Sequence, residues 1–241
     1  MGIKRWLNTL RKTPKKFKDP NRHAPKPWLR STTDSVTIGG YQEFTITSNT
    51  IKASAGSYDL ARKFELLYPI YNSENLTGKS FLDMGAAGGF FSFLATQNGA
   101  IVHAVDLDAN YTELILKATL QFKFAQLSVH TQNISEWTEK VDVVNALSLI
   151  HWIFSCTSVM GNMDTMIRFF KNITRDFLVI EWIDPQDEAI KYFNHLDYNV
   201  NFTDDSYNRK SFITSLESEF DKVESLGYTR KPTRELFIAR V

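Results

Sequence analysis

The sequence predicts an α/β fold, namely a doubly wound seven-stranded sheet of five parallel strands plus a C-terminal antiparallel hairpin. Beyond residue 79, short and nearly continuous apolar runs alternate with helical stretches, the pattern of a parallel sheet covered on both faces. A turn of small residues connects the first of these runs to the first helix. The C-terminal segment holds two strand-like runs with no helix between them, which predicts an antiparallel pair.

The expected elements follow one another along the chain. Two short β segments, Val36–Ile38 and Phe44–Ile46, precede a helix near residues 55–68 that has an apolar face. The parallel strands are expected at Ser80–Met84, Ile101–Asp106, Leu127–Thr131, Val141–Leu147 and Phe177–Glu181. The helices are expected at Phe90–Gln97, Ala109–Phe124, around Asn162–Lys171, and at Gln186–His195. The hairpin is expected at Asp221–Tyr228 and Glu235–Val241, joined by a loop that contains Pro232.

Length and charge predict one large domain with an N-terminal extension. The chain has 241 residues, of which 43% are hydrophobic, enough to bury a full core. Residues 1–30 hold ten Lys and Arg and one acidic residue, whereas residues 31–241 hold 18 basic and 26 acidic residues, a formal charge of −8. We therefore expect a basic arm and linker at 1–30 and a folded domain at 31–241.

The basic arm has several possible partners. Ile3, Trp6, Leu7 and Leu10 fall on one stripe of a short helix, and four prolines make residues 13–30 a poor helix and predict a linker there. Its charges suit RNA phosphates or an anionic membrane surface, and a solvated or partner-docked tail is equally open. Trp6 stands where a myristoylation signal needs Ser or Thr, so no lipid anchor is expected there.

Other features set aside several classes of protein. No apolar run approaches the roughly 20 residues needed to cross a bilayer, and the N-terminus has no apolar core of a secretory signal. Cys156 is the only cysteine, which excludes an intramolecular disulfide and a cysteine-based zinc cluster. The five histidines show no metal-ligand spacing, so no metal is expected. We expect a cytoplasmic protein.

The strongest functional signal is the segment Asp83-Met84-Gly85-Ala86-Ala87-Gly88-Gly89. It connects an apolar strand to an apolar helix, and its small residues allow a ligand to approach the backbone closely. Asp106 ends the next strand, 21 residues after Gly85, where a carboxylate can accept hydrogen bonds from a ribose diol. An acid directly before the turn suits a cationic cofactor, because it would repel a pyrophosphate.

These residues resemble the first two motifs of class I S-adenosylmethionine-dependent methyltransferases. The resemblance implies that Asp83 orients the methionine amine of the cofactor, that Gly85, Ala86, Ala87 and Gly89 line its methionine, that Asp106 holds its ribose, and that Leu107 packs on its adenine. Ala87 replaces the middle glycine of the motif, as in some RNA methyltransferases. Over residues 79–241 the sequence is similar to a little-characterised, nodulation-type bacterial branch of the family.

Further candidates follow the later strands. Asn133, after the third strand, and Asn145, on the fourth, are expected at the cofactor. Asn133 is equally interpreted as a turn residue. His151 is the candidate general base, since a neutral imidazole can take a proton as the methyl arrives, and a structural histidine is the alternative. Glu181 and Asp184 are expected to bind the substrate, although Asp184 before Pro185 is as well suited to cap the next helix.

The acceptor is not fixed by these motifs. An N-P-P-[YF] motif for methylating base nitrogens is missing. The lysine-containing tetrad of ribose 2′-O-methyltransferases is not supported either: its first lysine would fall near Tyr58-Asp59-Leu60, and Glu181 stands where its later lysine belongs. We expect methyl transfer to a hydroxyl or amine of a small molecule or glycan. The alternatives are an RNA methyltransferase and a catalytically inactive cofactor-binding scaffold.

Overall fold

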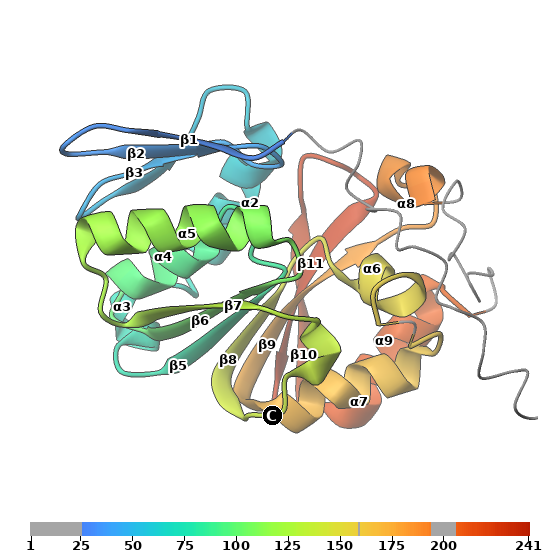
Figure 1. Cartoon of the computed structure of the whole chain (residues 1–241). Coiled ribbons are helices and arrows are strands. Elements are labelled where there is room, and N and C mark those ends of the chain that lie inside the picture. The colour runs from blue at the N-terminus through green and yellow to red at the C-terminus, as the bar shows by residue number, and fades with distance from the viewer. Residues whose placement is uncertain (1–25, 159, 194–205) are drawn as a thin grey trace, which may run out of the picture.

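The computed structural model describes residues 26–158, 160–193 and 206–241, which form two β-sheets and the helices that pack on them (Figure 1). The expected stripe at residues 3–10, most of the linker, and the end of the helix expected to reach His195 lie outside these residues. Within the described ranges, no helix is both long and apolar enough to cross a membrane.

The larger sheet has seven strands in the order β10-β11-β9-β8-β5-β6-β7. Strands β5 to β9 are parallel, and the hairpin β10-β11 adds to β9 in the antiparallel sense. The strands are β5 (Ser80–Met84), β6 (Ile101–Asp106), β7 (Leu127–Thr131), β8 (Val141–Ala146), β9 (Thr174–Ile183), β10 (Lys222–Tyr228) and β11 (Arg234–Arg240). The predicted fold class is confirmed.

Helices cover both faces of this sheet. Neighbouring strand residues point to opposite faces, so each face has its own buried apolar cluster. Phe81 and Val143 belong to one buried apolar cluster, and Leu82 and Val144 belong to the other. The first cluster includes residues of α2 (Tyr58–Leu67), α3 (Ser73–Leu76), α4 (Phe90–Gln97) and α5 (Ala109–Phe122). The second includes residues of η1 (Ile134–Glu136), α6 (Ile150–Ser155), α7 (Met163–Ile173), α8 (Glu188–Phe193) and α9 (Arg209–Glu219).

The smaller sheet is antiparallel and lies on the α5 side of the molecule (Figure 1). It consists of β1 (Trp28–Ser31), β2 (Val36–Gly39), β3 (Phe44–Ile46) and β4 (Ile51–Ala53). Its inner side chains reach the turn after β5, since a Cβ on Gly88 would lie 2.9 Å from Ile38 and 3.1 Å from Phe44. The sheet therefore packs directly on the small-residue turn.

Three local outcomes differ from the sequence expectations. The expected boundary at residue 30 falls inside β1, whose Trp28 ring lies over Gly39, so the folded part of the chain begins before residue 31. Strand β9 is longer than expected because it pairs with β8 on one side and along Phe177–Ile183 with β11 on the other. Helix α9 was not expected, since Phe212 and Leu216 are the only two large buried hydrophobic side chains in that polar segment.

Candidate cofactor and acceptor site

The turn after β5 has the backbone conformation that its small residues predict. Gly85 and Gly89 have φ values of +70° and +86°, in the region that favours glycine, and Ala87 has a φ of +46°. The N–H groups of Gly85 and Ala86 donate to the carbonyl of Val105, at 2.9 and 3.0 Å. The turn is thereby tied to the end of β6, and a Cβ on Gly85 would lie 3.0 Å from Leu149.

Asp106 is fixed at the end of β6 by two backbone donors. Ala87 N–H donates to its Oδ2 at 2.8 Å, and Asp108 N–H donates to its Oδ1 at 2.9 Å. Burial raises the pKa of Asp106 to about 6, against the opposing effect of these two hydrogen bonds. Each carboxylate oxygen can accept a second hydrogen bond, so the half-buried group retains one acceptor position on each oxygen.

Asp83 lies beneath the turn in a buried hydrogen-bond network. Ser92 Oγ donates to Asp83 Oδ2 at 2.6 Å, and Asn145 Nδ2 donates to Asp83 Oδ1 at 2.7 Å. Asn145 Oδ1 in turn accepts from the Tyr71 hydroxyl at 2.8 Å. Burial raises the pKa of Asp83, although the hydrogen bonds from Ser92 and Asn145 oppose this effect. Asp83 and Asn145 are thus joined under the turn, where they support it.

The residues expected at the adenine differ in their surroundings. Leu107 is exposed next to Asp106, which is compatible with packing on a planar ring. Asn133 caps η1: its Oδ1 accepts from Ser135 N–H, Ser135 Oγ and Ser158 Oγ, and its Nδ2 donates to the Thr157 carbonyl. These contacts match the alternative interpretation of Asn133 as a turn residue.

His151 lies in the first turn of α6, directly after β8, and is 2% exposed. Burial, together with the positive charges of Arg234 and Lys63, lowers its pKa to about 3, although Asp187 opposes the shift. The imidazole is therefore neutral near pH 7. Its electrostatic neighbours place it beside the charged cluster described next.

Glu181 on β9 forms the centre of a buried charged cluster. Its side chain is 0% exposed, and Lys63 Nζ of α2, itself 2% exposed, donates to its Oε2 at 2.8 Å. Ser148 N–H donates to the same oxygen at 2.6 Å, which holds Ser148 in a left-handed conformation with φ of +52°. The other oxygen, Oε1, is buried with no hydrogen-bond partner among the described residues.

The cluster continues to β11 and to the turn between β2 and β3. Arg234 donates to both oxygens of Asp187, at 2.9 and 3.0 Å, and its Nη1 lies 3.1 Å from Ser148 Oγ and 3.3 Å from the Tyr41 hydroxyl. Against the effect of burial, the hydrogen bonds from Arg234 and Thr233 hold the pKa of Asp187 well below its usual range. We define the charged cluster as Tyr41, Lys63, Ser148, Glu181, Asp187 and Arg234.

The structure brings Glu181 into this cluster but gives Asp184 a different environment. Asp184 Oδ1 accepts from Gln186 N–H at 2.8 Å, which closes a turn before α8, whereas the side chain that caps α8 is Asp187, whose Oδ1 accepts from Ala189 N–H at 2.9 Å. Among the other residues of the charged cluster, Lys63 could have been found from the sequence. It lies on the apolar face of its helix, three residues after Leu60 and four before Leu67, where a charged residue is unusual. Tyr41, Asp187 and Arg234 left none, since only tertiary contacts assemble them.

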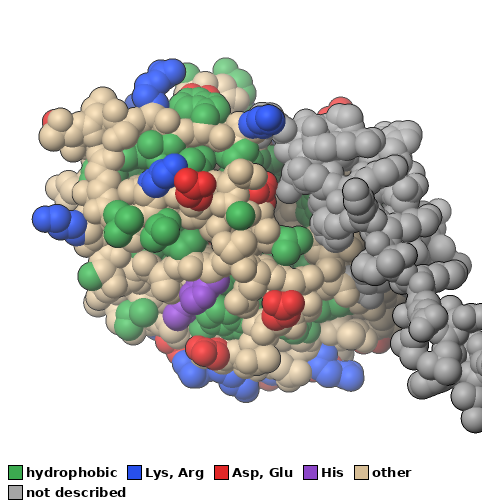
Figure 2. All heavy atoms as spheres, in the orientation of Figure 1, with side chains coloured by type: hydrophobic (Ala, Val, Ile, Leu, Met, Phe, Trp, Pro, Cys, Tyr) green, Lys and Arg blue, Asp and Glu red, His purple; other side chains and the backbone are tan. Residues whose placement is uncertain are grey.

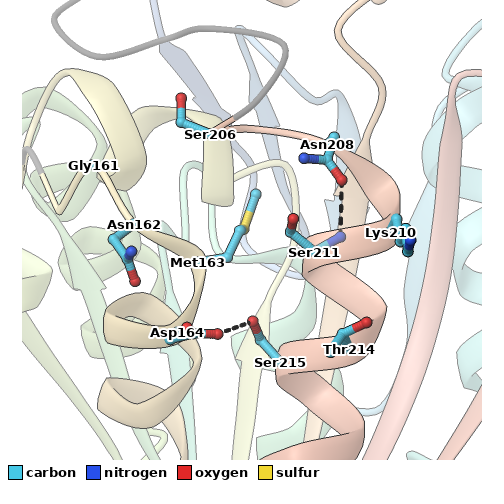
Figure 3. A pocket seen from close by; sticks show the side chains of 10 residues that line it. All are labelled: Gly161, Asn162, Met163, Asp164, Ser206, Asn208, Lys210, Ser211, Thr214 and Ser215. Carbon is cyan, nitrogen blue, oxygen red and sulfur yellow. Dashed lines mark hydrogen bonds between the residues drawn. The ribbon is translucent and has the colours of Figure 1, made fainter.

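A separate open hollow of about 490 Å³ lies between the N-terminal ends of α7 and α9 (Figure 3). At this hollow Ser211 N–H donates to Asn208 Oδ1, and Ser215 Oγ donates to Asp164 Oδ1. None of the residues predicted for the cofactor or acceptor lines it. Among the described residues, no group of three or more His, Cys, Asp or Glu side chains is arranged to hold a metal ion.

Comparison with known proteins agrees with the architecture. No sequence-family model matches the chain, and no curated protein matches it. A structure of the bifunctional kinase-methyltransferase WbdD matches with a TM-score of 0.60 and 16% identity over 76% of this chain and 40% of that chain. Magnesium protoporphyrin IX methyltransferase (ChlM) from Synechocystis PCC 6803 with bound SAH matches with a TM-score of 0.54 and 15% identity, over 76% and 82% of the two chains.

The same enzyme with bound SAM matches with a TM-score of 0.53 and 16% identity, over 76% of this chain and 78% of that chain. The chain has the fold of these methyltransferases. The chain spans only about 40% of the length of WbdD. At these identities the likeness establishes the methyltransferase fold and leaves the activity to be argued from the site.

Proposed function

We propose that the protein is an S-adenosylmethionine-dependent methyltransferase that acts on a hydroxyl or amine of a small molecule or glycan. The observation that carries the proposal is Asp106, which two backbone N–H groups orient beside the Gly85 turn while each of its oxygens keeps an acceptor position. A ribose diol supplies two donors of this kind. The methyltransferase fold, with structures of ChlM solved with SAM and SAH, supports this assignment.

In this proposal the end of β6 and the turn after β5 bind different parts of the cofactor. Asp106 holds the ribose, and exposed Leu107 packs on the adenine. Gly85, Ala86, Ala87 and Gly89 let the methionine moiety lie close to the backbone. Asp83 gives the region beneath the methionine a negative charge, which suits the cationic cofactor. The cofactor supplies an activated methyl group on a positively charged sulfur.

The acceptor is proposed to bind near the charged cluster. This cluster lies at the carboxyl ends of β8 and β9, the edge at which parallel α/β sheets bind ligands. Glu181 is 0% exposed, so its part in acceptor binding is indirect: it holds Lys63 and Ser148 in place through its Oε2. Asp184 stays a second proposed acceptor contact, although it lies outside the cluster and its Oδ1 accepts from Gln186 N–H.

The RNA alternative depends on the basic arm, of which residues 1–25 lie outside the described ranges. On the face shown in Figure 2, Lys and Arg side chains lie scattered among acidic and apolar ones rather than gathered in one broad patch. Phosphate binding over an extended surface needs such a patch. An inactive scaffold would bind cofactor without transferring methyl.

Calorimetric titration with S-adenosylmethionine, followed by transfer of its radiolabelled methyl group to total RNA or to a small-molecule extract, tests the proposal. We expect binding and label in the small-molecule fraction. Label in RNA alone would identify the RNA alternative. Binding without label in either fraction would identify the scaffold.

Replacing Asp106 by Ala should weaken S-adenosylmethionine binding by about 1–3 kcal/mol, the cost of leaving hydrogen-bonding groups without partners. Calorimetry measures the change, with exposed Asp34→Ala as the matched control. Since burial raises the pKa of Asp106 to about 6, affinity in the wild type should fall as the pH drops through 6, because the protonated carboxyl loses an acceptor position. Unchanged affinity in the variant would remove Asp106 from the ribose role.

If His151 takes the proton, His151→Ala should lower turnover by roughly 10²–10⁴ while cofactor affinity stays close to wild type. Because the pKa of His151 is lowered to about 3, its loss should leave no change in the pH profile near 6.5. Half-buried His130 on β7 provides the control variant, His130→Ala. Equal loss of turnover and of affinity would instead mark His151 as a structural residue.

A further inference from the structure

Two histidines and a serine converge on one face of the β6–β7 pair. His103 of β6 is paired with Ser128 of β7 in parallel register, and His130 lies two residues beyond Ser128. Since alternate strand residues point to the same face, the side chains of Ser128 and His130 share a face. There His103 Nδ1 lies 3.4 Å from His130 Nε2. Strand β7 is at the end of the seven-stranded sheet, so this group lies at its edge.

The hydroxyl of Ser128 completes a triangle of nitrogen and oxygen atoms. Its Oγ lies 2.8 Å from His103 Nδ1 and 3.1 Å from His130 Nε2. The same hydroxyl donates its proton to the Val102 carbonyl, at 3.0 Å. The lone pairs of Oγ are therefore left for the side on which the two imidazole nitrogens converge.

The spacing of these atoms is that of a metal coordination shell. Two nitrogen ligands on a tetrahedral Zn²⁺, with bonds of about 2.0–2.1 Å, lie about 3.3–3.4 Å apart. The imidazole nitrogens of His103 and His130 are 3.4 Å apart, so an ion can bind both without moving either strand. Ser128 Oγ is near enough to be a third ligand, although a neutral hydroxyl binds such ions more weakly than imidazole does.

Trp137 holds both imidazoles in place. Its ring centroid lies 5.1 Å from that of His103 and 5.4 Å from that of His130, and its Nε1–H donates to the Glu139 carbonyl at 2.8 Å. Trp137 is buried, whereas both imidazoles are half-buried, and histidine side chains reach the surface on the face shown in Figure 2. The two imidazoles are thus fixed by packing and remain partly open to solvent.

We propose that His103, His130 and Ser128 form a binding site for a divalent metal ion that prefers nitrogen ligands, such as Zn²⁺ or Ni²⁺. Imidazole suits these ions, whereas Mg²⁺ and Ca²⁺ favour oxygen. Burial and the neighbouring His130 lower the pKa of His103, although Glu139 opposes the shift, so its imidazole is neutral near pH 7, the form that binds metals. With two imidazoles rather than three, the site should bind an ion reversibly, and water supplies the remaining ligands.

An ion at this position joins two strands that are distant in sequence. His103 and His130 stand 27 residues apart, and only the pairing of β6 with β7 brings them together, so their spacing in the sequence gave no metal signal. Because the site exists only in the folded chain, a bound ion stabilises the fold by mass action. None of the three ligands is proposed to contact cofactor or acceptor, so methyl transfer by His130→Ala should stay close to wild type.

Quenching of tryptophan fluorescence by Ni²⁺ tests the site, because Trp137 packs on both imidazoles. The full chain, without an added histidine tag, is titrated with Ni²⁺ and separately with Mg²⁺. We expect saturable quenching by Ni²⁺, most of it lost in Trp137→Phe, and no such quenching by Mg²⁺. His103→Ala and His130→Ala should each weaken Ni²⁺ binding by at least about 10-fold, since losing even a group that supports a metal ligand costs that much.

The matched control is His23→Ala, which removes a histidine of the basic arm and should bind Ni²⁺ as the wild type does. Thermal unfolding gives a second measurement: Zn²⁺ should raise the melting temperature of the wild type and of His23→Ala, but not that of His103→Ala or His130→Ala. Circular dichroism without metal checks that each variant is folded, and His130→Gln takes the place of an alanine variant that is not. Wild-type affinity in both His103 and His130 variants, or an equal loss in His23→Ala, would overturn the proposal.

Discussion

Replacing Lys63 by Met should lower the free energy of unfolding by about 3–5 kcal/mol, because it leaves the carboxylate of Glu181 without its cation in a fully buried position. The methionine fills a similar volume, so the loss reports charge rather than packing. Burial lowers the pKa of Lys63, but Glu181, Tyr41 and Asp59 outweigh it and raise the pKa above its ordinary value. The contribution of Lys63 is therefore fully present below pH 10 and is lost only as the pH rises through the raised value.

Urea denaturation near pH 8 measures this loss. The matched control is Lys117→Met, which removes a pair with Glu113 whose two side chains are 56% and 63% exposed. That change should cost no more than about 0.5 kcal/mol, as is usual for exposed helical pairs. Equal small losses in the two variants would mean that water reaches Glu181 when the lysine is absent and that the cluster is not closed.

Replacing Arg234 by Gln should have a loss of similar size, about 3–5 kcal/mol, by leaving the buried carboxylate of Asp187 with a neutral partner. The pKa of Asp187 is held below its usual range mainly because the hydrogen bonds from Arg234 and Thr233 outweigh burial. Its stabilising contribution is therefore present above the unfolded pKa of about 3.9 and is lost as the pH falls through the lower, folded value.

The pH dependence separates this pair from a general loss of packing. We expect a constant difference in unfolding free energy between wild type and Arg234→Gln from pH 5 to 8, because this whole range lies above the unfolded pKa of about 3.9. Below that pH the difference should become smaller. Arg168→Gln is the control, since its pair with Glu219 has an arginine side chain that is mostly exposed. A difference that stayed the same into strong acid would show that the ion pair with Asp187 is not its source.

The charged cluster also fixes the loop after β8. Lys63 and Arg234 hold Ser148, whose left-handed backbone and N–H contact with Glu181 define the loop after β8. The same two cations act on Tyr41.

The sequence alone determined the sheet and the position of the small-residue turn after β5. Continuous apolar runs can be buried only between two layers of helices, and the strand bounds at Ser80–Met84, Ile101–Asp106 and Leu127–Thr131 follow from those runs. Small residues are needed wherever φ is positive, so Gly85 and Gly89 marked the turn. Asp106 was found by its spacing, because the end of one parallel strand lies beside the end of the next.

Tertiary structure decided the charged cluster. Tyr41, Lys63 and Arg234 come from a hairpin turn, a helix and the last strand, and no local pattern relates segments nearly 200 residues apart. Antiparallel addition of β11 to β9 brings Arg234 to the carboxyl edge of the parallel strands, and the turn between β2 and β3 brings the Tyr41 hydroxyl to 3.3 Å from Arg234 Nη1. Burial then sets the chemistry: it lowers the pKa of His151 to about 3 and stabilises Lys63 and Glu181 only as a pair, because an isolated charge in that position would cost too much.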